Sequence, residues 1–426
     1  MRGKRSFICA VAFLAALLCS GNVWAAGFQL FEQNASGIGN AYAGSAAVAE
    51  NASTIFFNPA GMTKLQAQEI SLGLTAVKPS IKFSNTGSTI PVPAAVYGPN
   101  TGTDGGDGGG WNLIPNAFLS SVLTKDLYVG LGISAPFGLA TEYESSFWGR
   151  YQSIKFSVET LNVNPSLAYR VNDMISIGVG ANLQNMKAEY ISQTISGIQG
   201  TLKADDYAWG WNAGVLLQLA PATRLGVSYR SSVKHTLKGT LSTSSPLPTP
   251  PLPPGSNTAA NAPATGDIEL PDTAIVSFTQ GLGSRWELLG DISWTRWSSV
   301  EAVNIYNVTI GATVKKLDTQ FKDSWRAAFG ANYKASEDWK FRFGLAFDQT
   351  PVPDAEHRMV SLPDSDRIAV ATGVQYKPTK NSALDLGVEY LFMKATDINN
   401  SSAGLVKGDY SNNNALILGA QCSMSF

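Results

Sequence analysis

Apolar and polar residues alternate one by one along most of the chain, from about residue 67 to the C-terminus. The C-terminal run shows this most clearly. On an extended strand, one face would carry Leu416, Leu418, Ala420, Cys422, Met424 and Phe426, and the other Gly419, Gln421, Ser423 and Ser425. A period of two residues predicts a β-strand with one apolar face. An aromatic residue at the end of such a strand is typical of the closing strand of a bacterial outer-membrane barrel. Phe426 is therefore also the expected contact for the barrel-assembly machinery.

The same alternation recurs in fourteen segments of the chain. We predict strands at 67–83, 111–123, 125–139, 152–171, 173–195, 201–220, 222–242, 264–281, 284–307, 319–335, 337–352, 363–378, 381–397 and 408–426. Together they predict an all-β fold, a 14-stranded antiparallel transmembrane β-barrel over residues 67–426.

The connections between these segments support the barrel. Tight turns are expected at Lys125-Asp126, Asn172-Asp173, Pro221-Ala222, Leu282-Gly283, Glu337-Asp338 and Thr379-Lys380, and longer connections at 84–110, 140–151, 243–263 and 353–362. Outer-membrane barrels have short turns on the periplasmic side and long loops outside. With an even strand count, the C-terminus and the start of the first strand both lie on the periplasmic side.

Composition agrees with a barrel that is apolar outside and mixed inside. Charged residues make up 15% of the chain, and some occupy every second position of segments such as 339–348. Such charges are tolerated only where one face of the strand looks into a lumen. A net charge of -1 without a basic patch argues against nucleic acid as a partner. A secreted β-sandwich would rarely continue the pattern for so long.

Residues 1–25 are predicted to be a secretory signal peptide. Three basic residues precede a short apolar stretch at 7–18, and small residues stand where cleavage before Ala26 would occur. The apolar stretch is shorter than the roughly 20 residues that span a bilayer. Cleavage leaves Cys422 as the sole cysteine, which excludes an intramolecular disulfide.

Residues 26–66 lack the alternation and are rich in small side chains, namely Gly37, Gly39, Ala41, Ala43, Gly44, Ala46, Ala47 and Ala49. A barrel of about eight strands is filled by its own side chains, whereas sixteen to eighteen strands leave an aqueous channel. Fourteen strands would enclose a lumen that leaks unless something fills it. The segment is therefore predicted to be an N-terminal hatch, or plug, inside the lumen.

Several motifs resemble the long-chain fatty acid transporter family of the outer membrane, which also includes toluene and xylene channels. They cover nearly the whole mature chain: Ala26-Gly27-Phe28-Gln29-Leu30, 37–44 (GIGNAYAG), Asn58-Pro59-Ala60-Gly61, 138–142 (GLATE), 210–214 (GWNAG), Tyr229-Arg230-Ser231, 322–326 (KDSWR), Pro351-Val352-Pro353 and 361–367 (SLPDSDR). The resemblance implies a fourteen-stranded barrel with a hatch. It also implies capture of a hydrophobic ligand at the outer loops, a hatch rearrangement and sideways exit into the membrane.

Three breaks in the alternation would turn an apolar side chain inward, at 215–217, 288–289 and 416–418. They could line an apolar path for the ligand. They could equally pack against the hatch.

The resemblance also suggests which residues contact a ligand. It places Lys322 near the ligand carboxylate, with Arg326 in the same motif as a further candidate, and a lysine ammonium would pair well with such a group. Lys187 is a looser candidate, in place of an arginine that the family uses. The alternative for Lys322 and Arg326 is a structural ion pair inside the lumen.

The resemblance also implies that a second group of residues takes part in hatch movement and gating. Asn58, Pro59 and Ala60 match the hatch signature, and Phe28 belongs to the N-terminal hatch motif. The family's gap-forming kink is expected on the third strand at Gly130 and Gly132, with Phe137-Gly138 as a second position, because glycines permit a bulge.

One departure from the family leaves the ligand open. The connection at about 193–203 is short, whereas the fatty acid transporters carry a long helical loop there that helps to build the capture groove. We therefore predict an uptake channel for hydrophobic compounds, foremost long-chain fatty acids, with an aromatic hydrocarbon channel as the alternative and a general porin as a weaker one. No cofactor is expected, and the two histidines show no catalytic motif, so the chain is not expected to be an enzyme. Outer-membrane lipid and lipopolysaccharide are the expected surroundings.

Overall fold

The computed structural model describes residues 27–66, 68–91, 101–194, 198–244 and 261–426. The predicted signal peptide, residues 1–25, lies outside the described residues, as does most of the connection at 243–263.

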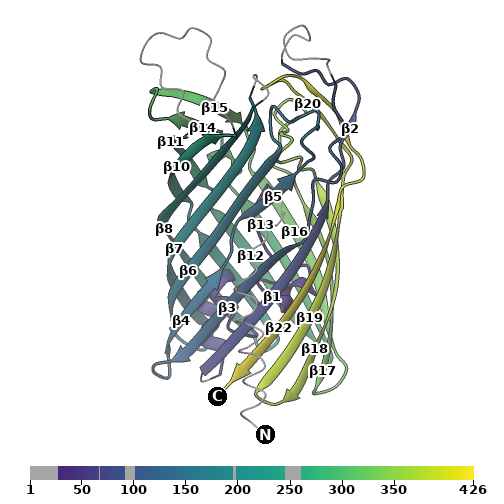
Figure 1. The fold of residues 1–426 in the computed structure, drawn as a ribbon. Coiled ribbons are helices and arrows are strands. Elements are labelled where there is room, and N and C mark those ends of the chain that lie inside the picture. Colours follow the sequence, from purple (N-terminus) through teal and green to yellow (C-terminus); the bar gives the residue numbers. More distant parts are fainter. Residues whose placement is uncertain (1–26, 67, 92–100, 195–197, 245–260) are drawn as a thin grey trace.

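The described strands form one closed antiparallel barrel (Figure 1). Fourteen strands cross it, five of them interrupted once, and each overlaps a predicted segment, so the predicted fold class is confirmed. The first half of the tenth strand, Ala312–Asp318, lies outside the predicted segment 319–335. In chain order they are β1 (Gln68–Ser80), β3 (Asn112–Val122), β4 with β5 (Leu127–Ser134 and Gly138–Glu142), β6 (Lys155–Arg170), β7 (Ile175–Gln193), β8 (Gln199–Ala220), β9 with β10 (Thr223–Arg230 and Val233–Thr243), β11 with β12 (Asn261–Leu270 and Thr273–Leu282), β13 with β14 (Trp286–Thr295 and Ala302–Asn307), β15 with β16 (Ala312–Asp318 and Ser324–Lys334), β17 (Trp339–Asp348), β18 (Arg367–Thr379), β19 (Ser382–Met393) and β22 (Asn414–Ser425).

The last strand closes the barrel against the first. β22 pairs antiparallel with β1, with Thr75 opposite Gly419, and this removes the free strand edges that an open sheet would expose. Its predicted two faces are confirmed. Leu418 and Phe426 are exposed on the outside, while Gln421 and Ser423 are buried inside.

Turn lengths differ between the two ends as predicted. All six predicted tight turns connect neighbouring strands, and the described parts of the long connections lie at the opposite end of the barrel (Figure 1). Two predicted strands were too long. Residues 396–400 and 406–410 form β20 (Thr396–Asn400) and β21 (Val406–Tyr410), which pair with β2 (Ser84–Asn85) in a separate sheet. Alternation continues there because the hairpin also has a buried face, where Tyr410 packs 5.6 Å from the Phe83 ring.

The outer surface of the barrel is apolar with aromatic pairs near the short turns. Trp286 packs on Tyr333 and Trp339 on Tyr376, each with ring centroids 4.7 Å apart. Aromatic side chains at this position suit the membrane–water interface, where outer-membrane barrels carry girdles of aromatic residues.

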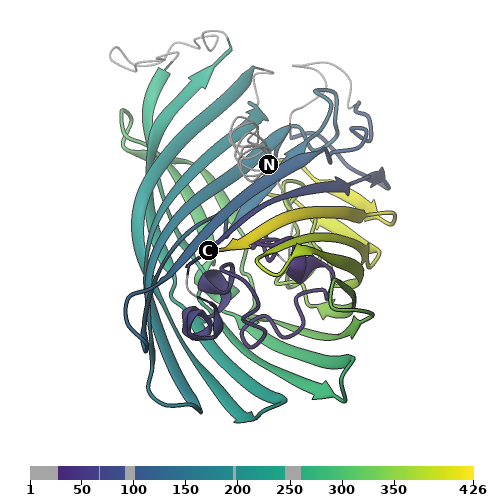
Figure 2. The ribbon, with the colours of Figure 1, turned by 90° about the horizontal axis from the view of Figure 1, so that it is seen from below.

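Residues 27–66, called here the inner segment, lie inside the ring of strands (Figure 2). The segment contains α2 (Ala35–Ile38), α3 (Thr54–Phe57) and η1 (Pro59–Lys64). Asn34 caps α2 by accepting from Gly37 N, and the Asn58 side chain caps η1 by accepting from Ala60 N. Such side-chain caps satisfy backbone donors that short helices leave free. No helix among the described residues is long and apolar enough to cross a membrane.

The three breaks in alternation all pack against this segment. Leu216 is buried with Ala47, Ala49 and Ala60. Leu289 and Ile417 are fully buried in a cluster that includes Ile38. Of the two predicted roles for these breaks, the structure supports packing.

Candidate functional site

The hydrogen-bond ladder of the barrel wall is interrupted on the third strand. β4 pairs with β3 only between the residue pairs Ala117–Ile133 and Val122–Tyr128. The strand then breaks at 135–137 before β5 begins. β5 pairs with β6 on one side, from Gly138–Glu159 to Glu142–Lys155, and with no other strand of the described residues. The upper part of β3 pairs with β1 alone. The wall between β3 and β5 is thus not held by a backbone ladder.

The start of the inner segment fills the missing pairing from within. Leu30 N donates to Pro136 O at 2.8 Å, and Gly138 N donates to Phe28 O at 2.9 Å. The Gln33 amide also bonds the backbone of Ala135, donating to its carbonyl at 2.8 Å. Buried backbone groups need partners, and here the partners belong to the inner segment. The interrupted wall and the N-terminal residues are therefore joined directly.

An apolar cavity lies above this junction. Its volume is about 70 Å³. Residues from the inner segment, from β6, β7, β8, β10, β11, β14 and β15, and from three connecting segments line it: Phe28, Phe156, Val158, Met186, Ala188, Tyr190, Leu202, Ala204, Leu237, Ala264, Thr265, Gly266, Ile268, Val300, Val303, Ile305, Leu317, Thr319, Phe321, Met359 and Leu362. Nearly all are apolar, so the cavity suits a hydrophobic ligand.

Phe28 connects the cavity to the interrupted wall. Its ring lines the cavity, packs edge-on against the Trp297 ring with centroids 4.9 Å apart, and lies tilted against the Phe137 ring with centroids 5.9 Å apart. Its carbonyl accepts from Gly138 at the start of β5. On its other side, Gly27 N donates to the Asp364 carboxylate at 3.1 Å. A ligand that displaces the Phe28 ring would act on residues bonded to the wall.

None of the three predicted ligand contacts lines this cavity. The Lys322 side chain is exposed, and its backbone N–H donates to Pro351 O at 2.9 Å. Lys187 is exposed too, in register between Glu159 of β6 and Asp205 of β8. The structure does not bring these two lysines together, and their contact with ligand stays a prediction.

Arg326 has a different environment. It is buried, donates to Ala41 O at 2.6 Å and lies over the Phe31 ring at 4.7 Å. Both partners belong to the inner segment. In this structure Arg326 therefore holds the inner segment to β16.

The predicted hatch residues Asn58, Pro59 and Ala60 sit on β7 and β8. The Asn58 amide donates to Val215 O at 3.0 Å and to Ala46 O at 2.8 Å. Gly178 and Gly214 permit this approach, because a Cβ at Gly178 would overlap the Ala60 backbone and one at Gly214 would overlap the Asn58 side chain.

Gly130 and Gly132 lie in a part of β4 that pairs regularly on both sides. A Cβ at Gly130 would lie 2.5 Å from Met62 Sδ, and one at Gly132 would lie 3.1 Å from the Phe118 ring. Gly130 therefore makes room for the inner segment. The interruption itself falls at 135–137, next to the second predicted position, Phe137-Gly138.

A buried ionic group that the sequence analysis missed joins the inner segment to the wall. Arg342 of β17 pairs with Glu50 at 2.7 Å and with Asp385 at 2.8 Å, and Lys340 pairs with Glu50 at 2.8 Å. Burial alone would raise the pKa of Glu50, but the charges of Arg342 and Lys340 outweigh it and hold the pKa below its usual range. The available signal was the inward position of Arg342 and Asp385 on their strands, since Glu50 lies in a segment without periodicity.

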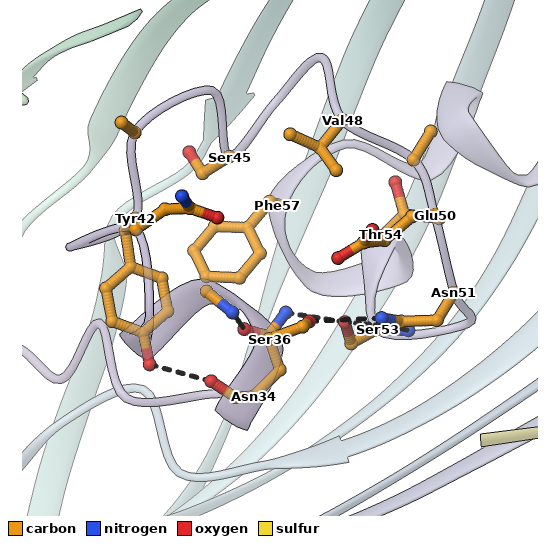
Figure 3. Close-up of a pocket in the computed structure, with 14 residues that line it drawn as sticks. Asn34, Ser36, Tyr42, Ser45, Val48, Glu50, Asn51, Ser53, Thr54 and Phe57 are labelled. Atoms are coloured by element: carbon orange, nitrogen blue, oxygen red, sulfur yellow. Dashed lines mark hydrogen bonds between the residues drawn. The ribbon is translucent and has the colours of Figure 1, made fainter. Parts of the chain in front are cut away.

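A second, polar cavity lies within the inner segment itself (Figure 3). Tyr42 donates to Asn34 O at 3.0 Å, the Asn34 amide donates to Ser53 Oγ at 2.6 Å, and Asn51 donates to Ser36 Oγ at 3.1 Å. Its volume of about 40 Å³ would hold about three or four water molecules. Its polar lining does not suit a hydrophobic ligand, which leaves the apolar cavity as the candidate site.

Comparison with known proteins agrees with this geometry. Residues 16–426 match the family model described as outer membrane protein transport protein (OMPP1/FadL/TodX). The long-chain fatty acid transport protein of Escherichia coli K12 is 29% identical over 94% of this chain and 95% of its own length. The 47 kDa outer membrane protein of Pasteurella multocida is 30% identical over 88% and 90%.

Solved structures share the fold. A Pseudomonas aeruginosa FadL homologue superposes with a TM-score of 0.83 at 22% identity, covering 94% of this chain and all (100%) of that one. The Pseudomonas putida toluene transporter TodX has a TM-score of 0.67 at 17% identity over 92% and 98%. The chain therefore belongs to the OMPP1/FadL/TodX family of outer-membrane transport proteins, and its barrel lies in the outer membrane.

Proposed function

We propose that the protein is an outer-membrane channel that imports hydrophobic compounds, foremost long-chain fatty acids. One observation carries the proposal: Phe28 both lines the apolar cavity and accepts a hydrogen bond from the interrupted wall strand. The names of relatives point the same way, since several are called long-chain fatty acid transport proteins and a structural neighbour is called a toluene transporter.

We propose the following transport route. A ligand is captured among the outer loops and enters the apolar cavity. Burial of each methylene group from water is worth about 0.8 kcal/mol, so an acyl chain prefers this site to an aqueous pore. By the same reasoning, the ligand leaves most favourably into lipid.

The size of the cavity requires a movement during transport. At about 10–15 Å³ for each water-sized group, 70 Å³ holds about five to seven such groups, fewer than a long acyl chain contains. Phe28 is the lining residue that comes from the inner segment, and its carbonyl accepts from Gly138 of β5. Its displacement would break the Gly138–Phe28 bond and release the edge of β5. We infer that the ligand then exits sideways between β3 and β5.

The inner segment acts in this scheme as a hatch, with residues 26–66 as the hatch and 67–426 as the barrel. Its contacts with β7, β8, β16 and β17 support this role. A hatch that fills the lumen would give little ion conductance in planar bilayers. A general porin would conduct strongly.

A monoaromatic hydrocarbon is the second candidate ligand. A single ring fits the present cavity volume with little rearrangement. The direct connection between β7 and β8, whose end residues Gln193 and Gln199 pair with each other, leaves little chain for an outer capture groove.

We propose no catalytic role. His235 lies against Asp206 at 3.1 Å and His357 against Asp354 at 2.8 Å, and neither contacts a serine hydroxyl among the described residues. We also propose that Phe426, which is 66% exposed, contacts the barrel-assembly machinery, and that lipopolysaccharide surrounds the outer rim.

The function is tested by uptake in cells that lack their own transporter and express this chain. We expect labelled oleate to enter faster than in cells with an empty vector. Faster entry of labelled toluene alone would favour the hydrocarbon channel. Entry of neither compound above the control would refute the proposal.

A further inference from the structure

A polar cavity of about 240 Å³ adjoins the apolar cavity on its outer side. The two share the side chains of Tyr190, Leu317 and Met359. The polar cavity, called here the vestibule, is also lined by Gln152, Ser153, Lys315, Lys316, Asp318, Glu356, His357, Val360, Ser361, Asn400, Ser401 and Ser402. It lies at the end of the barrel where Figure 1 labels β15 and β20.

Polarity changes along a single stretch of chain that passes from one cavity to the other. Phe321, Thr319 and Leu317 line the apolar cavity, and Lys315 of β15 lines the vestibule. β7 follows the same course: Met186 and Ala188 line the apolar cavity, and Tyr190 borders both. From Lys315 to Phe321 the chain spans at most about 20 Å. This is the length scale of an extended acyl chain and exceeds that of one aromatic ring.

Lys315 differs from the other basic side chains of the vestibule. Lys316 pairs with Asp318 at 3.4 Å, and His357 lies 2.8 Å from Asp354. The Lys315 ammonium instead donates to the backbone carbonyls of Tyr151 at 3.2 Å and Gln152 at 3.1 Å. No carboxylate of the described residues lies within ion-pair distance of it.

The position of this ammonium is well defined. Besides its two carbonyl acceptors, it lies 5.4 Å from the centroid of the Tyr190 ring, which itself donates to Gln152 O. A lysine ammonium has three donor hydrogens. Two are used by the carbonyls, and the third is available for an anionic acceptor entering the vestibule.

We propose that the vestibule is a head-group site and that Lys315 binds the carboxylate of a single-chain fatty acid, so that it determines specificity for acids over neutral hydrocarbons. The proposal rests on the proposed function, because the acyl chain would occupy the adjoining apolar cavity with its far end toward Phe28. The carboxylate supplies the anionic partner that Lys315 lacks. A toluene-like ligand would leave the vestibule unused.

The test compares oleate with its uncharged methyl ester, using purified full-length protein in detergent and displacement of a fluorescent fatty acid. Lys315→Met keeps most of the aliphatic stem and removes the charge. We expect oleate to bind about 10- to 100-fold more weakly to this variant, because hydrogen bonds to charged groups contribute in that range. Methyl oleate should bind as well as it does to the wild type.

Two matched lysine variants serve as controls. Lys316→Met removes the neighbouring lysine, which has its own acidic partner, and should leave oleate binding unchanged. Lys322→Met removes the lysine suggested by family resemblance. If Lys322→Met weakens oleate and Lys315→Met does not, the head group lies at Lys322 and our assignment is wrong.

Charge reversal gives an independent readout. Lys315→Glu should reject oleate and gain affinity for oleylamine, the cationic counterpart of the same chain. Equal weakening of oleate and methyl oleate in Lys315→Met would mean that the residue only supports packing, which overturns the proposal. If the wild-type protein binds neither probe, the proposed function itself is refuted, which is a different result from loss of discrimination.

Discussion

The guanidinium of Arg342 in β17 lies 2.7 Å from the carboxylate of Glu50, so an ion pair with a buried arginine joins the inner segment to the barrel wall. Asp385 of β19 accepts from the same guanidinium at 2.8 Å, and both Arg342 and Asp385 are 1% exposed. Removing one member of a buried ionic group typically costs about 3–5 kcal/mol, because the remaining charges lose their partner. This contact should therefore help to keep the lumen closed.

Arg342→Met should loosen the inner segment and make the barrel leak. Asp385 would lose its cationic partner, and Glu50 would keep only Lys340. We expect a higher baseline conductance in planar bilayers than for the wild type. Lys334→Met is the matched control, since it removes an exposed pair with Glu337 that should contribute little. Equal conductance of Arg342→Met and wild type would show that other contacts hold the segment.

The inner segment should also respond to pH through Glu32. Burial raises the pKa of this carboxyl to about 7, against the opposing charges of Arg367 and Arg326. In the unfolded chain the group titrates near 4.5, so the folded state binds more protons between these two pH values. Stability should therefore be highest below pH 4.5 and fall by about 3 kcal/mol as the pH rises to about 7, since each pKa unit corresponds to about 1.4 kcal/mol.

Hydrogen exchange checks this dependence. Protection of the backbone amides of residues 27–66, corrected for intrinsic exchange, should be greater at pH 5 than at pH 8. Glu32→Gln keeps the shape and cannot ionise, so the difference in protection between the two conditions should become smaller. If Glu32→Gln retained the full pH dependence of protection, other carboxyl groups would be responsible for it.

Gly214→Ala should displace Asn58 and the turn around it from the barrel wall. The added methyl group would overlap the Asn58 side chain, which now donates to Val215 O. Overpacking of this kind costs about 1–3 kcal/mol. Protease cleavage within the inner segment should therefore become faster. Gly200→Ala lies in the same strand, where the new methyl group would meet its nearest neighbours only at 3.8 Å, and it should behave like the wild type.

The sequence predicted those parts of the architecture in which each strand must have one apolar face, and it missed those that depend on contacts between distant residues. Every barrel strand must turn one face to lipid, so alternation located all fourteen strands. The same alternation was misleading at 396–397 and 408–410, because a hairpin with one buried face produces an identical pattern. Alternation also does not predict that the hydrogen-bond ladder between β3 and β4 ends at Ala117. This end depends on how the N-terminal residues bond to β5.

The candidate site was harder to predict for a related reason. Motif resemblance pointed to Lys322, which is exposed, whereas the nearby Lys315 faces the vestibule. Between them the chain leaves β15, and Gln320 adopts a φ of 41°. A backbone change of that kind redirects the side chains that follow it, and it has no clear sign in the sequence. The pair of Arg342 with Glu50 escaped prediction because the two residues meet only after the inner segment has folded into the barrel.

Covalent attachment of the N-terminus to the interrupted strand gives the sharpest test of the transport route. Gln29 and Phe137 face each other in an antiparallel bridge, flanked by the bonds from Leu30 N to Pro136 O and from Gly138 N to Phe28 O. Residues in such a pair without mutual hydrogen bonds have Cα atoms about 4.5 Å apart, within the range that a disulfide spans. Gln29→Cys with Phe137→Cys should therefore crosslink under oxidising conditions. If the N-terminal residues must leave β5 for the ligand to pass, the oxidised variant will take up little oleate, and reduction will restore uptake in the same cells. Comparing two redox states of one variant cancels any effect of losing the Phe137 ring. Equal uptake in both states would mean that the ligand passes while Phe28 and Gly138 stay joined, and the route between β3 and β5 would have to be abandoned.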